Sequence, residues 1–303
     1  MKTFNSCDKK LIEKFILECS ANGLKKKSII RHLSRIKHIR GIIKKDFVNW
    51  GIDDVKRCVA ELSSGNYHGW TIYGYKISLR KFFSFIGKKS IIKWIRLDVG
   101  RIKVKYEILG RDEIESMISI ARTLRDKAFI STLYGSGCRI GELVDLKTDD
   151  ISWDEHGCVL NIKESKTEPR PIRLIEFSQY LELYLKHRKY KSDYVWIAED
   201  NYWKGKKMSV KALRKLLFRV KRLVGVQKRV YLHGFRHSRA TELSRYLTDQ
   251  EMKIFFGWSR NSRMPNVYSH LSGRDVDEKM ISMFYPKKEI IEDKKIHTLK
   301  EFI

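Results

Sequence analysis

The sequence predicts a mainly α-helical protein with one small β-sheet, organised as two domains. Apolar residues recur at three- and four-residue steps over most of the chain, which is typical of amphipathic helices. One stretch, residues 158–175, changes to a period of two, which is typical of strands. The chain has 303 residues, of which 42% are hydrophobic and 33% charged, so it is long enough for two ordinary cores and has the composition of a folded, soluble protein.

Residues 1–90 are expected to form a helical bundle. Four amphipathic segments follow one another, with these apolar positions in chain order: Leu11, Ile12, Phe15, Ile16 and Cys19; Ile29, Leu33, Ile36 and Ile43; the stretch from Asp53 to Leu62; and Ile72, Tyr75, Leu79, Phe82, Phe83 and Ile86. This region holds 20 lysines and arginines against 7 aspartates and glutamates, an excess of 13 positive charges. Such an excess on a folded bundle indicates a surface that grips the backbone of DNA.

Residues 91–106 (IIKWIRLDVGRIKVKY) lose the helical period and gain glycine and basic residues, so a basic linker is expected there. The second domain is expected at 107–285. Its first helix is predicted to open at Asp112, whose carboxylate would cap the free N–H groups. The core face of that helix would consist of Ile114, Met117, Ile118 and Ala121.

Two further patterns lie inside the second domain. The run AFISTLYGSG predicts a buried helix that is ended by Gly135 and Gly137. A β-hairpin is predicted from the alternation of Cys158, Leu160 and Ile162, the polar turn KESKTEP, and the alternation of Ile172 and Leu174. After about Phe177 the pattern is helical again, and residues 286–303 are expected to form a tail helix.

The formal net charge of +27, with a pI near 9.8, indicates a polyanionic partner. A solubility device or a ribosome-like tail would also be basic, but here the charge is spread through segments that have helical periodicity. No apolar run of roughly 18 residues is present, and the first residues carry charges where a signal peptide is apolar, so a cytoplasmic protein without a membrane partner is expected. Five cysteines without a CxxC pair fit reduced thiols better than disulfides or a zinc site.

Polar residues in segments whose neighbours look like core are the candidates for chemistry. They are Arg139 in GSGCRIGELVDL, Lys166 on the hairpin turn, His233 and Arg236 in HGFRHSRATEL, Trp258 in FFGWS, and Tyr268 in NVYSHLS. Taken alone, each has a simpler explanation. Arg139 could pair with Glu142 one helical turn on, and a lysine on a hairpin turn is more often solvated than catalytic. An HxxR pair can arise by chance in so basic a chain, and any one of 14 tyrosines is far more often structural.

Taken together, in this order and spacing, these residues resemble the tyrosine recombinase and integrase family. The motifs that carry the resemblance are GCRIGEL, HGFRH and the GW…VYSHLS block, and it covers nearly the whole chain. It implies a SAM-like core-binding bundle at the N-terminus, followed by an α+β catalytic domain. The segment MPNVYSHLSGRDVD is similar to that of archaeal chromosomal, viral or plasmid members.

Attack on a phosphodiester requires the same residue types on chemical grounds. A phosphodiester under attack gains negative charge, which planar guanidinium groups hold in a bidentate grip, so Arg139 and Arg236 are expected to hold the phosphate. Tyr268 is the expected nucleophile; a phenol has a pKa of about 10 and needs nearby positive charge or a proton acceptor to react. His233 is the expected candidate to relay that proton.

By resemblance, Lys166 is the general acid that protonates the leaving 5′-oxygen, with Lys163 as the fallback. Trp258 stands where many relatives have a second histidine and others have tryptophan, and its indole N–H can still donate to the phosphate. Other polar residues are expected to be supporting or structural: Glu142, which would hold Arg139 or nearby backbone, His237 and His270.

A tyrosine attack conserves the phosphodiester energy in a 3′-phosphotyrosyl bond, so no ATP, cofactor or metal is expected. The sequence has no GxxxxGKS or GxxxxGKT loop, no HExxH motif and no carboxylate cluster suited to two-metal chemistry. By resemblance, the partner is double-stranded DNA with specific recombination sites. Four protomers would exchange two strands at a time through a Holliday junction, and the free protein would be a monomer or weak oligomer associated with the nucleoid.

By the same resemblance, the biological task would be integration or excision of a mobile element, or Xer-like resolution. The tail helix, with Ile290, Ile291, Leu299 and Phe302, would pack on its own domain or dock on a neighbouring subunit. Two rival functions remain: a catalytically silent DNA-binding accessory protein, and a type IB topoisomerase-like nicking and closing enzyme. A requirement for paired specific sites would separate a recombinase from the latter. A structural chromatin protein would explain the charge but not the ordered set of residues.

Overall fold

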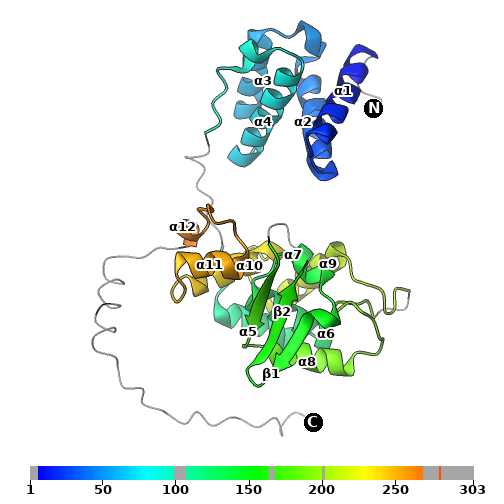
Figure 1. Ribbon diagram of the computed structural model, residues 1–303, viewed down its shortest axis with the longest axis vertical. Coiled ribbons are helices and arrows are strands. Elements are labelled where there is room, and N and C mark those ends of the chain that lie inside the picture. Colours follow the sequence, from blue (N-terminus) through cyan, green and yellow to red (C-terminus); the bar gives the residue numbers. More distant parts are fainter. Residues whose placement is uncertain (1–5, 99–106, 164–167, 200–201, 269–279, 281–303) are drawn as a thin grey trace. The chain divides into compact units, whose positions relative to one another are not determined.

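The computed structural model describes residues 6–98, 107–163, 168–199, 202–268 and 280. The chain divides into two compact units, residues 1–105 and residues 106–303. Among the described residues, none of the helices is both long and apolar enough to span a membrane. The expected class, mainly α with a small β-sheet, is confirmed (Figure 1).

The N-terminal unit is a bundle of helices (Figure 1). Its elements are α1 (Ser6–Ala21), α2 (Lys26–Ile43), the 3₁₀ turn η1 (Phe47–Asn49), α3 (Ile52–Ser64), α4 (Gly69–Phe85) and the 3₁₀ turn η2 (Lys89–Ile92). The apolar stripes seen in the sequence supply the core, with Phe15, Ile36, Phe82 and Phe83 almost fully buried. The carboxylate of Asp8 is also buried, and it accepts a hydrogen bond from Nε of Arg40 at 2.6 Å.

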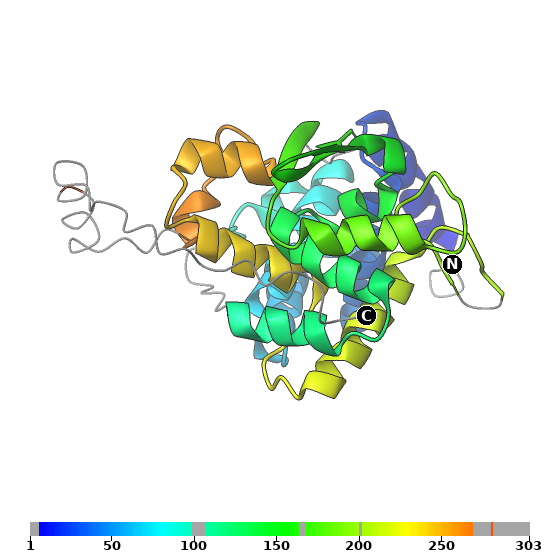
Figure 2. The ribbon, with the colours of Figure 1, turned by 90° about the horizontal axis from the view of Figure 1, so that it is seen from below.

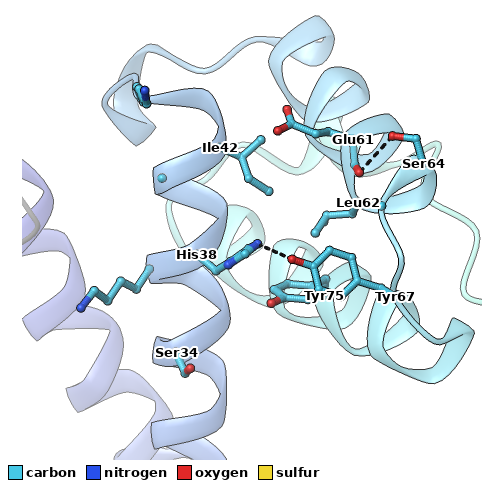
Figure 3. Close-up of a pocket in the computed structure, with 12 residues that line it drawn as sticks. Ser34, His38, Ile42, Glu61, Leu62, Ser64, Tyr67 and Tyr75 are labelled. Atoms are coloured by element: carbon cyan, nitrogen blue, oxygen red, sulfur yellow. Dashed lines mark hydrogen bonds between the residues drawn. The ribbon is translucent and has the colours of Figure 1, made fainter.

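An open groove lies on the surface of this bundle between α2 and the facing parts of α3 and α4 (Figure 3). Lys37, His38 and Lys44 line it from the α2 side, while Tyr67 and Tyr75 line it from the other side. Nε2 of His38 and the hydroxyl of Tyr67 lie 3.2 Å apart and form a hydrogen bond. The groove therefore combines aromatic rings with cationic side chains.

The C-terminal unit combines helices with one sheet (Figure 2). Its helices are α5 (Arg111–Ile120), α6 (Leu124–Ser136), α7 (Ile140–Asp145), η3 (Thr148–Asp150), α8 (Ser178–His187), α9 (Val210–Val224), α10 (Leu232–Leu243), α11 (Asp249–Phe256) and α12 (Pro265–Tyr268). Helix α6 is buried over most of its length and packs against α5, α8 and α10. It ends at Gly137, whose φ of 56° lies in the left-handed region that favours glycine.

The sheet is antiparallel, in the order β1 (Ile151–Asp154), β2 (Gly157–Ile162) and β3 (Arg170–Leu174). The predicted alternation is confirmed: Leu160 pairs with Ile172, and both side chains are buried. The same register pairs Ile162 with Arg170, so an arginine continues the buried face of β3. Strand β1 was not predicted, because ISWD is short and three of its four residues are exposed.

The structure corrects two further expectations. Helix α5 begins at Arg111, and its cap is not Asp112: the carboxylate of Glu113 accepts a hydrogen bond from the backbone N–H of Gly110 at 2.7 Å. The chain also does not return to helix directly after α8. Residues 188–199 and 202–209 contain no helix, because Arg188 bonds to the carbonyls of Ser192 and Tyr194 and isolated β-bridges hold this segment.

Candidate active site

Arg139 lies at the sharp corner between α6 and α7, directly before the first residue of α7. Its Nη1 donates to Oε1 of Glu142 at 2.8 Å, and its Nη2 donates to the carbonyl of Gly257 at 2.9 Å. The Arg139 side chain keeps 23% of its surface exposed. The pairing with Glu142 was the simpler explanation of Arg139 from the sequence, and the structure contains it. The same geometry nevertheless leaves part of the Arg139 side chain open to solvent.

Glu142 is a buried carboxylate that joins two arginines. Its second partner is Arg170, whose Nη2 donates to Oε2 at 2.9 Å and whose Nη1 donates to Oε1 at 3.3 Å. Burial alone would raise the pKa of Glu142, but the hydrogen bonds and charge of Arg170, with the bonds from Arg139, lower it to about 2. Glu142 is therefore ionised at neutral pH and fixes the position of Arg139.

Arg170 is a residue of this site that the sequence reasoning missed. Its side chain is buried, and Nε donates to the carbonyl of Phe255 at 2.9 Å, so it ties β3 to the end of α11 as well as to Glu142. A usable signal was present: Arg170 continues the inward period-two positions of Ile172 and Leu174. A charged residue in an inward position of a strand requires a partner of opposite charge.

Arg236 comes from α10 and is 2% exposed. Its Nη1 donates to the carbonyl of Gly137 at 2.9 Å and its Nη2 to the carbonyl of Phe256 at 2.5 Å. The guanidinium also lies 5.0 Å from the ring centre of Phe256 and 5.7 Å from that of Trp258. Burial, followed by the charge of Arg139, lowers the pKa of Arg236 to about 10, so the side chain stays cationic at neutral pH. Two positive guanidinium groups are thus held close together.

Gly257 allows these arginines to approach the end of α11. Its φ is 57°, and a Cβ atom built there would lie 2.6 Å from Nη1 of Arg170. The carbonyl of the same residue accepts the hydrogen bond from Arg139. A side chain at this position would therefore displace Arg170 and strain the backbone that orients Arg139.

Tyr268 ends the short helix α12, which lies next to α11 and α10 (Figure 1). Its ring is parallel to that of Trp258, with 5.7 Å between centroids and 1° between planes. Trp258 in turn stacks on Phe256 at 4.9 Å. The phenol of Tyr268 is hydrogen-bonded to Nδ1 of His237, and the two rings are 5.8 Å apart. The tyrosine is 4% exposed.

The histidine at the phenol is thus His237, whereas the sequence suggested His233. The two residues are one turn apart on α10, and their rings are 4.7 Å apart in an edge-to-face contact. His233 as a residue is exposed, but its imidazole is partly buried. This burial lowers the pKa of His233, and the charges of Arg236 and Arg139 lower it further. It borders the two arginines rather than the phenol. Sequence alone could not choose, because the choice depends on how α12 packs against α10.

Lys163 directly follows β2 and is exposed, and its Nζ is 2.6 Å from Oδ1 of Asp150. That ion pair raises the pKa of Lys163. Lys166, His270 and the expected tail helix at 286–303 lie outside the described residues. Within the described residues, no group of three or more histidine, cysteine, aspartate or glutamate side chains is arranged to hold a metal ion.

The profile of the phage integrase family matches residues 107–274. Tyrosine recombinase XerA of Pyrococcus horikoshii is 29% identical over 195 residues, which cover 63% of this chain and 65% of that protein. Tyrosine recombinase XerD of Listeria innocua is 31% identical over 186 residues, 56% of this chain and 61% of that protein. The matched stretches are thus less than two thirds of these relatives' length.

Two solved structures share the fold. The integrase of transposon Tn1549, in complex with circular intermediate DNA, has a TM-score of 0.70 at 17% identity, covering 89% of this chain and 98% of that one. The site-specific recombinase XerH, bound to a palindromic difH substrate, has a TM-score of 0.69 at 19% identity, covering 90% of this chain and 84% of that one. The similarity in fold therefore extends over most of the chain.

Proposed function

Because this chain belongs to the phage integrase family, we propose that it is a site-specific tyrosine recombinase that cleaves and rejoins DNA through a 3′-phosphotyrosyl intermediate. The observation that carries the proposal is the convergence of Tyr268 and Arg236 on the Trp258 ring, with Arg139 bonded to the carbonyl of the preceding residue, Gly257. Tyr268 stacks on that ring, and the guanidinium of Arg236 lies 5.7 Å from its centre. Residues far apart in sequence are thus assembled into one site with a nucleophile and cationic groups.

In this proposal, Arg139 and Arg236 hold the scissile phosphate. Arg139 is partly exposed and anchored by Glu142, while Arg236 is fixed by two backbone carbonyls. A guanidinium has five N–H donors, so Arg236 can serve those carbonyls and still donate to phosphate oxygens. Because both groups are held before DNA arrives, they stabilise the developing negative charge without first having to reorganise. His233, beside them, supplies a further hydrogen bond to the phosphate, and the Trp258 ring supports the nucleophile.

The leaving 5′-oxygen needs a proton, and we assign that role to Lys166 on the β2–β3 turn. Lys163 is the alternative from the sequence, but its ion pair with Asp150 raises its pKa and so makes it a weaker acid. The proposed reaction uses no metal or cofactor, because attack, charge stabilisation and protonation are all assigned to side chains.

The proposed partner is double-stranded DNA with specific recombination sites. Support comes from the N-terminal unit, where cations of α2 and α4 gather around His32. Burial lowers the pKa of His32, and the positive charges of Lys81, Arg35 and Arg31 lower it further. The groove of Figure 3 on the same unit is lined by two further cations, Lys37 and Lys44. Positive charge gathered on a folded surface is the electrostatic footprint of a DNA-binding unit. The Tn1549 integrase and XerH, which share the fold, were both solved with DNA.

We further propose that four protomers assemble on paired sites, that the free protein is a monomer or weak oligomer, and that it acts in the cytoplasm on the nucleoid. The task would be integration or excision of a mobile element, or Xer-like resolution. Relatives of both kinds match this chain, since Transposase A of transposon Tn554 from Staphylococcus aureus is 28% identical over 202 residues, besides XerA and XerD.

The decisive experiment is the capture of a covalent protein–DNA adduct without metal or ATP. A pool of nicked duplexes with a randomised core is incubated with the unmodified chain and with Tyr268→Phe, and denaturation-resistant complexes are isolated and sequenced. We expect an adduct from the unmodified chain and none from Tyr268→Phe, because the phenol oxygen forms the bond to phosphorus. Strand exchange between two copies of the recovered site would then separate a recombinase from a nicking and closing enzyme.

Two results would contradict the proposal. An adduct that survives in Tyr268→Phe would place the nucleophile elsewhere. Tight DNA binding with no adduct from the unmodified chain would favour a DNA-binding accessory protein without chemistry.

A further inference from the structure

The phenol of Tyr268 is in direct contact with a second histidine of α10, His237. This residue follows Arg236 and is 4% exposed. Its Nδ1 is hydrogen-bonded to the tyrosine hydroxyl, which is the atom that would react with DNA. A buried imidazole nitrogen at a nucleophile's hydroxyl is the arrangement that general-base activation requires.

We propose that His237 is a catalytic residue whose Nδ1 accepts the phenolic proton of Tyr268 as the phenol oxygen attacks the DNA phosphorus. This inference rests on the proposed recombinase function. In the cleavage step the O–H bond of Tyr268 breaks and its proton passes to Nδ1, while the oxygen–phosphorus bond forms. The bond from phosphorus to the 5′-oxygen breaks, and that oxygen takes a proton from the hairpin lysine. Rejoining runs in reverse, and the imidazolium returns its proton to the phenol.

The protonation state of His237 is compatible with a role as a general base. Burial, then the neighbouring His233, then Arg236, lower the pKa of His237 to about 4, so the imidazole is neutral at neutral pH and has one nitrogen available as an acceptor. The charge that His237 would gain during attack is unfavourable next to Arg236 in the free protein. A bound phosphate supplies negative charge at that place and stabilises the imidazolium. Proton transfer is thereby favoured when DNA occupies the site.

A merely structural role for His237 is the competing explanation, and other contacts bear on it. The Tyr268 ring already lies parallel to Trp258, and the Ser244 hydroxyl donates to the backbone carbonyl of Tyr268 at 3.1 Å. The ring and the backbone of the tyrosine are therefore positioned by groups other than His237. The imidazole contacts the hydroxyl, which is the part of the side chain that reacts.

The test uses the full chain and a duplex recovered by adduct capture. His237→Ala and the more conservative His237→Asn are compared with the unmodified chain and with His187→Ala, a control that removes an exposed histidine at the end of α8. We expect the adduct to form about 10²–10⁴-fold more slowly in both His237 variants, because that is the usual effect of losing a general base. DNA affinity should stay unchanged, and His187→Ala should behave like the unmodified chain.

Two chemical modifications, one of the nucleophile and one of the DNA, distinguish a proton-transfer role of His237 from a structural role. Tyr268 is replaced by a tetrafluorinated tyrosine, whose phenol is ionised at neutral pH and needs no base; the deficit of His237→Ala should then largely disappear. A duplex with sulfur in place of the 5′-bridging oxygen has a leaving group that needs no acid. On this substrate His237→Ala should remain slow, whereas Lys166→Ala should recover.

The outcomes distinguish a failure of the proposed function from a failure of the role of His237. If the unmodified chain forms no adduct with any duplex, the proposed function fails and this inference fails with it. If the adduct forms and His237→Ala forms it at the unmodified rate, only the role of His237 is overturned. The role of His237 is also overturned if the deficit of His237→Ala persists with the fluorinated tyrosine, because the effect would then be structural. It is overturned as well if the deficit disappears with the sulfur leaving group, because His237 would then act as the general acid.

Discussion

The two units of this protein use positive charge in different ways. Within residues 6–98, no lysine or arginine side chain is buried. In the C-terminal unit, Arg170 and Arg236 are buried, and each is fixed by carbonyl oxygens or by Glu142. Exposed cations act over a distance and are screened by salt, whereas buried guanidinium groups act through fixed hydrogen bonds. The first arrangement suits attraction to a polyanion, and the second suits holding one phosphate.

This difference has an energetic consequence. A buried charge is tolerated only while its partners remain, since removing one partner leaves the other desolvated and unpaired. A change in the catalytic cluster should therefore reduce both stability and reaction rate. A change on the N-terminal surface should reduce DNA affinity alone, because exposed side chains contribute little to folding.

The largest effect is expected at Glu142, and it should depend on pH. Its folded pKa of about 2 lies below the ordinary value of 4.5, so the stability it supplies is fully present above pH 4.5 and is lost as pH falls toward 2. The contribution is about 3 kcal/mol, since one pKa unit corresponds to about 1.4 kcal/mol. Glu142→Gln should lower the free energy of unfolding of the C-terminal unit by roughly this amount at pH 7.

Urea unfolding of the unmodified chain and of Glu142→Gln between pH 7 and pH 2 measures this difference. The gap between the two proteins should shrink as the pH falls through this window. Glu182→Gln, at an exposed glutamate on α8, is the control and should change little. A gap that stays constant with pH would show that the carboxylate charge of Glu142 is not what holds the arginine cluster.

A smaller effect is expected at Gly257, which tests whether the cluster needs its tight packing. Gly257→Ala should cost about 1–3 kcal/mol, because a left-handed φ is strained with a side chain and the new Cβ would meet Arg170. Adduct formation should fall tenfold or more as Arg170 and Arg139 are displaced. The matched control is Gly225→Ala, since Gly225 also has a positive φ but nothing lies near its added Cβ. Equal losses at both glycines would mean that backbone strain, and not crowding of the arginines, explains the result.

Part of this fold and site could be predicted from the sequence, and part depends on tertiary packing. The helical stripes and the β2–β3 alternation were predictable because burial imposes a period on the residues. The set Arg139, Arg236 and Tyr268 was found through its order along the chain. Which histidine contacts the phenol was not predictable, because His233 and His237 share one helix and only the packing of α12 against α10 distinguishes them.

The corrections have similar physical causes. Arg170 was missed because charged residues are usually exposed, and its inward position is apparent only from the register of β3 with β2. The cap of α5 was misplaced by two residues, because Asp112 and Glu113 can both accept from free N–H groups and the geometry of the turn decides between them. The irregular segment after α8 is held by Arg188, by bridges within the segment and by one bridge from Tyr194 to Lys147, and that distant pairing is not revealed by any local pattern.

The smallest effect is expected on the N-terminal surface, and it completes the comparison. Arg31 and Lys81 are among the cations that lower the pKa of His32, so they belong to a positive region around this residue. Arg31→Ala or Lys81→Ala should each weaken DNA binding and reduce the slope of log affinity against log salt by about 1. Stability should change by no more than about 0.5 kcal/mol, and adduct formation at saturating protein should be unaffected.

Lys45→Ala provides the matched control, because the Lys45 ammonium is already paired with Asp54 at 2.8 Å. Its removal should leave the salt slope nearly unchanged, which binding titrations from low to high salt would measure for all three variants. If Arg31→Ala or Lys81→Ala instead slowed the adduct at saturation, the bundle would take part in assembling the reactive complex. The division between an attracting unit and a phosphate-holding unit would then have to be abandoned, because exposed charge would be acting on the chemical step as well as on encounter.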